Sequence, residues 1–206
     1  MCGIVGLFLK DPKLEPQLGA MLTDMLITMT DRGPDSAGIA IYGRPEKGKA
    51  KLTVQSPTPE ADFATLAEDL GKAIAAKVTG QAKDTHMVLE LPEDRLEAAR
   101  HAMRDLRPKA KVMSAGEGIE IYKEVGLPKD VAARFEVARM SGTHGIGHTR
   151  MATESAVTTL GAHPFSTGDD QCLVLGHGHG RRGRYSQPQD TGKEECEGDG
   201  MFAAGS

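Results

Sequence analysis

The amino-acid sequence predicts one sizeable domain of the α+β class. A length of 206 residues suits a single domain with room for a smaller insertion. Short apolar runs typical of strands occur among longer segments whose apolar residues recur at helical spacing. A hydrophobic content of 39% and a charged content of 26% are ordinary for a globular protein. We therefore expect strands and helices to be built around one core.

The first part of the chain alternates between strands and helices. Residues 3–9 form an apolar run that predicts a buried strand. Residues 17–29 place a stripe of leucines and methionines at helical spacing, which we interpret as core packing. The next expected elements are a strand at 39–42, an exposed turn at 43–51, a strand at 52–54, an amphipathic helix at 60–78 and a polar connection at 79–84.

Residues 85–125 predict a β-α-β-β unit, which we interpret as a small α+β insertion whose carboxylates and lysines form a solvated surface. Its expected elements are a strand at 87–91, a helix at 92–106 with a proline near its start, and strands at 111–113 and 119–122. A helix at 128–140 and a strand at 171–175 follow. Residues 176–206 are Gly-rich, polar and poorly patterned, so we expect an atypical, disordered tail there.

Charge and composition exclude several classes of partner. The net charge is −4 with no basic block, and aromatic residues are 4% with no Trp, so nucleic acid is not an expected partner. No apolar run approaches the ~18 residues of a membrane span, and the N-terminus lacks a signal-peptide pattern. The three cysteines cannot all pair and their spacing fits no zinc site, so no metal or cofactor is predicted. A reducing cytoplasm is the expected location, because it keeps a thiol usable.

Cys2 is the first candidate for chemistry, because it directly follows the initiator Met. Removal of Met1 would leave a thiol and a free α-amine on the same residue. The amine titrates near ~7.7–8.0 and the thiol near ~8.5. A neutral amine can accept the thiol proton, directly or through a water, so one residue would supply both nucleophile and base. The alternative is an ordinary buried thiol at the start of a strand.

Two further stretches carry polar residues at informative positions. Residues 31–38 form a turn-rich segment that leads into a strand. The segment 145–154 is otherwise typical of core or of a cleft, yet it contains the polar side chains of His148, Thr149, Arg150 and Thr153. An arginine suits two-pronged binding of a carboxylate, so this segment is a candidate binding site for an acidic group.

Three motifs, MCGIVGL at 1–7, DRGPDSAGIAIY at 31–42 and GIGHTRMAT with AHPF within 145–165, together carry a family resemblance. In this order they resemble the class II glutamine amidotransferase domain of the N-terminal-nucleophile hydrolases. That domain occurs in glucosamine-6-phosphate synthase, amidophosphoribosyltransferase, asparagine synthetase and glutamate synthase. The resemblance implies a four-layer α-β-β-α sandwich, incomplete here, over residues 1–175. The insertion at 85–125 looks most like that of the small amidotransferase subunit of glutamate-synthase-like, N-methylglutamate synthase systems.

The resemblance also assigns roles to individual residues. Cys2 matches the nucleophile, and Arg150 matches the residue that binds the α-carboxylate of glutamine. Thr153 matches a neighbour in the same pocket, and Arg32 matches an arginine that supports it. A further group matches structural positions near the site, namely Gly3, Asp35, Ser36 and His163.

The chemistry that the resemblance implies is hydrolysis of the glutamine amide. The Cys2 thiolate attacks the amide, ammonia leaves, and water hydrolyses the γ-glutamyl thioester to glutamate. The ammonia would pass to a partner subunit of the glutamate-synthase type, because no second catalytic domain is evident here.

The sequence departs from the family after its last expected strand. The family places an Asn-Gly oxyanion pair there, whereas this chain reads Gly176-His177-Gly178. Asp199 is a poor match for the residue that binds the substrate α-amine. We expect this region to reflect a shifted reading frame or a truncated gene. Two alternatives therefore remain, a degenerate non-catalytic subunit that binds or regulates a synthase, and an N-terminal-Cys amidase that acts on another amide.

Overall fold

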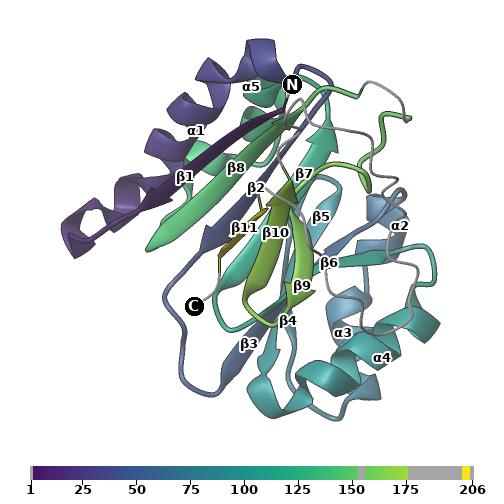
Figure 1. Cartoon of the computed structure of the whole chain (residues 1–206). Coiled ribbons are helices and arrows are strands. Elements are labelled where there is room, and N and C mark those ends of the chain that lie inside the picture. Colours follow the sequence, from purple (N-terminus) through teal and green to yellow (C-terminus); the bar gives the residue numbers. More distant parts are fainter. Residues whose placement is uncertain (1, 153–155, 176–200, 205–206) are drawn as a thin grey trace.

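The computed structural model describes residues 2–152, 156–175 and 201–204, which form three antiparallel sheets and five α-helices (Figure 1). The first sheet has the strand order β1 (Gly3–Phe8), β8 (His144–Arg150), β2 (Ser36–Tyr42), β7 (Ile119–Val125). The second has the order β4 (Thr79–Lys83), β5 (His86–Pro92), β3 (Lys49–Gln55), β6 (Lys111–Gly116). The third has the order β11 (Met201–Ala204), β10 (Gln171–Leu175), β9 (Phe165–Gly168). This mixed architecture agrees with the predicted α+β class.

The first hydrophobic core lies between the first sheet and helices α1 (Leu18–Thr28) and α5 (Pro128–Arg134). Leu22 and Leu26 of α1 are fully buried, as the helical spacing predicted. Two glycines of β8 let them approach the sheet: a Cβ on Gly145 or on Gly147 would lie 2.8 Å from a methyl carbon of Leu22 or Leu26, respectively. The glycines of this strand therefore serve packing.

The second core lies between the second sheet and helices α3 (Leu66–Ala73) and α4 (Leu96–Leu106), with α2 (Pro59–Phe63) preceding α3. In Figure 1, α1 and α5 lie at one end of the molecule and α3 and α4 at the other. The prediction of one helix over 60–78 was wrong, because α2 and α3 are separate and α3 ends at Ala73. Ala75 adopts a left-handed conformation there, and the Ala76 N–H donates to the Gly71 carbonyl at 3.0 Å. That bond is the C-terminal motif which closes many helices.

The polar connection expected at 79–84 is instead the edge strand β4. It pairs antiparallel with β5 over its whole length, from Thr79 opposite Glu90 to Lys83 opposite His86. Most of its side chains are exposed, so apolar alternation is missing, and its pairing rests on backbone hydrogen bonds to β5. The periodicity of the sequence therefore gave no sign of a strand.

The strands of residues 85–125 pair with strands from outside that segment. β5 and β6 lie on either side of β3, whereas β7 lies beside β2 in the first sheet. The segment thus contributes to both large sheets and is not a subdomain placed on the main core. The helix expected at 128–140 is also shorter, because Glu136 is left-handed and separates α5 from a 3-10 turn, η4 (Val137–Arg139).

The third sheet is anchored by Asp170 in the turn between β9 and β10. Its carboxylate accepts backbone hydrogen bonds from Glu117, Gly118 and Ile119 at 2.7–3.0 Å, in the turn between β6 and β7. Residues 201–204 of the expected disordered tail form β11, which pairs with β10. The remainder of that tail lies outside the described residues.

Candidate functional site

The N-terminal end of β1 is fixed by the hydroxyl group of Thr149. Gly3 lies opposite Thr149 in the ladder between β1 and β8. The Gly3 N–H donates to Thr149 Oγ1 at 3.2 Å, and this hydroxyl donates to the Met29 carbonyl at 3.2 Å. A Cβ on Gly3 would lie 2.7 Å from Thr149 Oγ1, so only glycine fits without a shift of its neighbours. Cys2, which immediately precedes Gly3, is a half-buried free thiol.

The register of the first sheet brings three predicted residues into one row. Gly3 pairs with Thr149, and continuing this register by one residue sets Cys2 opposite Arg150. On its other side Arg150 pairs with Ser36 of β2. Residues directly opposite each other in antiparallel strands carry their side chains on the same face. Thr149 and its neighbours Gly147 and Gly145 face α1, so this row faces the opposite side of the sheet.

The turn that precedes β2 holds the backbone on both sides of Arg150. The Asp35 N–H donates to the Arg150 carbonyl at 3.1 Å, and Asp35 Oδ2 accepts from the Ala152 N–H at 2.7 Å. Asp35 therefore fixes the chain on both sides of the Arg150 peptide. A Cβ on Gly161 would lie 3.0 Å from Arg150 Nη1, so the guanidinium extends toward the loop before His163.

The two other residues predicted to bind substrate are Arg32 and Thr153, and only Arg32 lies among the described residues. Arg32 ends the 3-10 turn η2 (Thr30–Arg32), and its backbone N–H donates to the Met29 carbonyl that also accepts from Thr149. Its side chain is exposed. Thr153 lies outside the described residues. The backbone of Arg32 therefore lies near Gly3, because both are connected to the Met29 carbonyl, Arg32 directly and Gly3 through Thr149.

His163 packs between His148 of β8 and Phe165 of β9. Its ring is 4.4 Å from the ring of His148 and 4.5 Å from that of Phe165, and the His163–Pro164 peptide is cis. A Cβ on Gly38 would lie 1.9 Å from the His163 carbonyl oxygen, so the loop contacts the backbone of β2. His148 Nε2 bonds to the carbonyl of Leu175 at 3.0 Å, which connects β8 to the end of β10.

Sequence reasoning missed two residues that shape this region. Thr149 was noted only as a polar residue in the segment, although its hydroxyl bridges Gly3 and Met29. Lys123 was assigned to a solvated surface together with Glu124, yet both are buried. That expectation was wrong because the carbonyls of the 160–164 loop bond to Lys123, whereas Glu124 bonds to Thr85 and Thr159. The alternation of polar and apolar residues within one strand cannot reveal that a distant segment of the chain buries its polar side chains.

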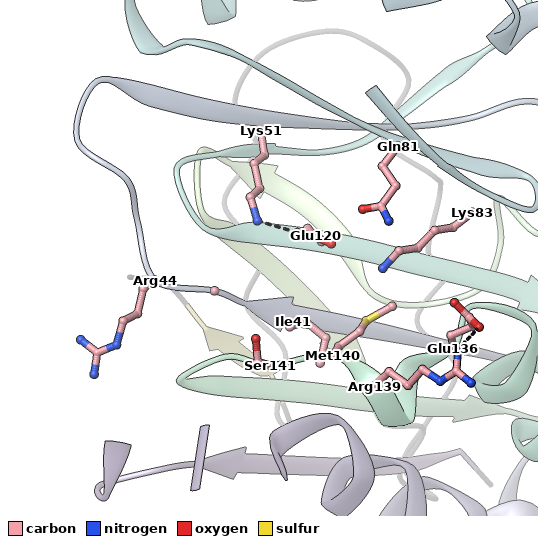
Figure 2. A pocket seen from close by; sticks show the side chains of 11 residues that line it. Ile41, Arg44, Lys51, Gln81, Lys83, Glu120, Glu136, Arg139, Met140 and Ser141 are labelled. Atoms are coloured by element: carbon pink, nitrogen blue, oxygen red, sulfur yellow. Dashed lines mark hydrogen bonds and ion pairs between the residues drawn. The ribbon is translucent and has the colours of Figure 1, made fainter. Parts of the chain in front are cut away.

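A pocket of about 440 Å³ opens elsewhere, between the first two sheets. Figure 2 shows Lys51, Gln81 and Lys83 of the second sheet above Glu120 and Ile41 of the first, with Lys51 Nζ 2.6 Å from a Glu120 oxygen. The pocket lies by the end of β2 opposite to Ser36. Its lining includes neither Cys2 nor the arginines predicted to bind substrate, so it is separate from the Cys2 row.

Within the described ranges, no cluster of three or more His, Cys, Asp or Glu side chains is arranged to hold a metal ion. In the same part of the chain, none of the helices has the length and apolarity that crossing a membrane requires.

Comparison with known proteins identifies relatives that share most of this chain. It is 66% identical over 175 residues to the glutamine amidotransferase-like protein GlxB of Rhizobium meliloti, a match that covers 84% of this chain and 58% of that protein. It is 31% identical over 180 residues to a putative glutamine amidotransferase of Methanothermobacter thermautotrophicus, covering 81% of this chain and 57% of that protein. A shorter match of 60 residues, 43% identical, relates 29% of the chain to 9% of a glutamine–fructose-6-phosphate aminotransferase of Methanosarcina acetivorans.

No family model matches the chain. The chain spans somewhat more than half the length of the two relatives that match most of it. Their names support the assignment of this chain to the glutamine amidotransferase family.

Proposed function

We propose that the chain is the glutaminase part of a class II glutamine amidotransferase, with Cys2 as its nucleophile. The observation that supports this proposal is the strand register: Gly3 pairs with Thr149, and extension of the ladder by one residue would put Cys2 opposite Arg150 on one face of the first sheet. A thiol and a guanidinium in adjacent strands suit a substrate that carries a scissile amide at one end and a carboxylate at the other. Glutamine is such a substrate.

The proposed reaction uses the residues of this row in sequence. After Met1 is removed, the Cys2 α-amine takes the thiol proton and the thiolate attacks the amide carbon. The C–N bond breaks, ammonia leaves with a proton returned by the amine, and a thioester remains. Water then hydrolyses the thioester to glutamate and restores the thiol. In this scheme Arg150 binds the substrate α-carboxylate, with Arg32 and Thr153 in the same pocket.

The donors for the oxyanion would lie beyond β10. His148 holds the Leu175 carbonyl on the side of the sheet that Arg150 faces, so the chain leaves β10 close to the proposed site. The sequence there reads Gly176-His177-Gly178 in place of Asn-Gly. Loss of one such donor lowers the rate by roughly 10²–10³ in a well-studied enzyme. This difference favours the second candidate function, a non-catalytic subunit that binds or regulates a synthase.

The wider assignment follows from the same family. We propose the four-layer α-β-β-α sandwich as the complete fold, with the domain over residues 1–175 and ammonia delivered to a glutamate-synthase-like partner subunit in the cytoplasm. The packing of each of the two large sheets against its own helices supports this fold. An N-terminal-Cys amidase with another substrate would share the fold, but an arginine opposite the nucleophile favours a substrate with a carboxylate.

Labelling with 6-diazo-5-oxo-norleucine, a reactive glutamine mimic, tests the proposal. We expect one covalent adduct on Cys2, with Met1 absent, in intact-mass and peptide spectra. Arg150→Met should weaken labelling, whereas Cys172→Ser should leave it unchanged, because Cys172 is fully buried in another cluster. A processed Cys2 that stays unlabelled at saturating reagent would argue against catalysis and favour the binding subunit.

A further inference from the structure

Lys123 is a buried cation surrounded by carbonyl groups. It lies in β7 opposite Gly38, and only 4% of the residue is exposed. Its Nζ donates to the carbonyls of Ala162 at 2.9 Å, Pro164 at 3.2 Å and Leu160 at 3.4 Å. The same nitrogen lies 4.4 Å from the centre of the Phe165 ring. An ammonium group has three N–H donors, so this loop satisfies all of them.

Burial of a charged group costs free energy unless hydrogen bonds or an opposite charge compensate for the lost hydration. Transfer of an ammonium group from water to a buried site carries a large desolvation penalty. Within the described ranges Lys123 forms no ion pair, and burial lowers its pKa to about 7. A methionine or leucine would fill the same volume without this penalty. The three carbonyls therefore indicate that the lysine holds the loop in one conformation.

The loop that Lys123 holds contacts the Arg150 side chain. Gly161 lies between two of the bonded carbonyls, and its position is the one where a Cβ would lie 3.0 Å from Arg150 Nη1. Farther along the loop, the His163 carbonyl lies against Gly38, which is the partner of Lys123 across the strands. Displacement of the loop would therefore alter the space into which the guanidinium extends.

We propose that Lys123 is a positioning residue that holds residues 160–164 against Arg150 and thereby sets the affinity of the site for the substrate carboxylate. This inference rests on the proposed function, because it assigns Arg150 to substrate binding. Lys123 acts through the loop and touches no reacting atom. Its loss should therefore weaken binding while the reactivity of the Cys2 thiol is retained.

The test compares Lys123→Met with wild type in labelling by 6-diazo-5-oxo-norleucine, which needs no turnover. Intact-mass spectra at a series of reagent concentrations give the half-saturating concentration and the limiting rate at Cys2. We expect the half-saturating concentration to rise about tenfold while the limiting rate changes less than about threefold. Lys111→Met is the matched control. Lys111 and Lys123 line one surface pocket, but Lys111 is exposed, so its replacement should leave both parameters unchanged.

A second variant keeps the test decisive if Lys123→Met does not fold. Gly161→Ala leaves Lys123 in place but puts a methyl group against Arg150 Nη1, so it should raise the half-saturating concentration in the same way. Two results with folded Lys123→Met would overturn the inference. One is an unchanged half-saturating concentration, and the other is a fall in the limiting rate as large as the rise in the half-saturating concentration. Failure of wild-type Cys2 to react at all would instead overturn the proposed function itself.

Discussion

His86 is a single side chain whose protonation opposes folding. It is fully buried, with its ring 4.8 Å from Phe135 and 5.8 Å from Tyr122. Its Nε2 has no hydrogen-bond partner among the residues that the structure describes. Burial, reinforced by the nearby charge of Lys123, lowers its pKa from 6.5 to about 3. The folded protein therefore keeps a neutral imidazole at pH values where the unfolded chain binds a proton.

We expect this difference to make the protein sensitive to acid. Between pH 6.5 and pH 3 the unfolded state binds one more proton than the folded state at this residue, so the free energy of unfolding falls as the pH is lowered. Urea unfolding at several pH values should show a smaller fall for His86→Phe than for wild type. His101→Gln changes an exposed histidine and should behave like wild type. Parallel curves for wild type and His86→Phe would contradict this assignment.

Residue roles could be predicted from the sequence only where a motif carried them. Cys2 and Arg150 were predicted because their neighbours resemble a family, and the ladder between β1 and β8, which begins at Gly3 and Thr149, is consistent with their lying close together. Lys123 could not be found in this way, because a lysine in an alternating strand is usually solvated. Its burial depends on a loop about 40 positions later in the chain, and the sequence holds no local sign of that contact.

At the scale of elements, the position of the β9–β10 hairpin depends on one carboxylate. Asp170 is buried and left-handed, and its oxygens accept three backbone N–H groups from the turn between β6 and β7. Gly116 in that turn leaves room for it, since a Cβ there would lie 2.4 Å from the Asp170 carboxyl carbon. These charge-assisted hydrogen bonds fasten the hairpin to that turn, in addition to the burial of Cys172 beside Met113 of β6.

Asp170→Asn should loosen this attachment without changing the local backbone, because asparagine also tolerates a left-handed conformation. The amide removes the charge and turns one acceptor into a donor, so we expect a loss of about 2 kcal/mol in the free energy of unfolding. Thermal or urea unfolding measures it. Asp169→Asn is the control, since Asp169 is exposed and pairs with Arg100, and it should lower stability by less than about 1 kcal/mol. Equal losses in the two variants would contradict a special role for Asp170.

The elements that the sequence predicted well are those that bury apolar stripes. Helix α1 and strand β5 agree with their expected ranges because packing follows their periodicity. Strand β1 also has nearly the expected range, but it is an edge strand in which Phe8 is exposed, so the expected burial of this run was wrong. Two of the failures, β4 and the single helix over 60–78, depend on backbone hydrogen bonds and on one left-handed residue, Ala75. Neither feature leaves a periodic signal in side-chain hydrophobicity.

At the scale of the whole molecule, the three sheets meet around Cys172. This residue of β10 is fully buried in a cluster with Tyr42 of β2, Met113 of β6 and Ile121 of β7. The Tyr42 hydroxyl donates to its sulfur at 3.3 Å, and burial raises the pKa of the thiol. Access of a reagent to Cys172 therefore requires that strands of different sheets separate.

Thiol labelling of Cys172 should report this separation. In a Cys2→Ser/Cys196→Ser variant, we expect labelling in native buffer to be at least about 10³-fold slower than in denaturing urea. Its rate should rise with urea in parallel with the loss of far-UV circular dichroism. Fast labelling of the native protein would instead show that the third sheet opens while the other two remain folded.

The hydroxyl of Thr149 has a consequence for how the proposed nucleophile is placed. It joins the Gly3 N–H to the Met29 carbonyl, and Met29 immediately follows α1. The position of the C-terminal end of α1 therefore determines where the first residues of β1 are held. Adding or deleting one residue in α1 would rotate that carbonyl by about 100° around the helix axis and take it away from the hydroxyl. The length of a helix that contributes no group to the chemistry would then decide where the reactive thiol is held.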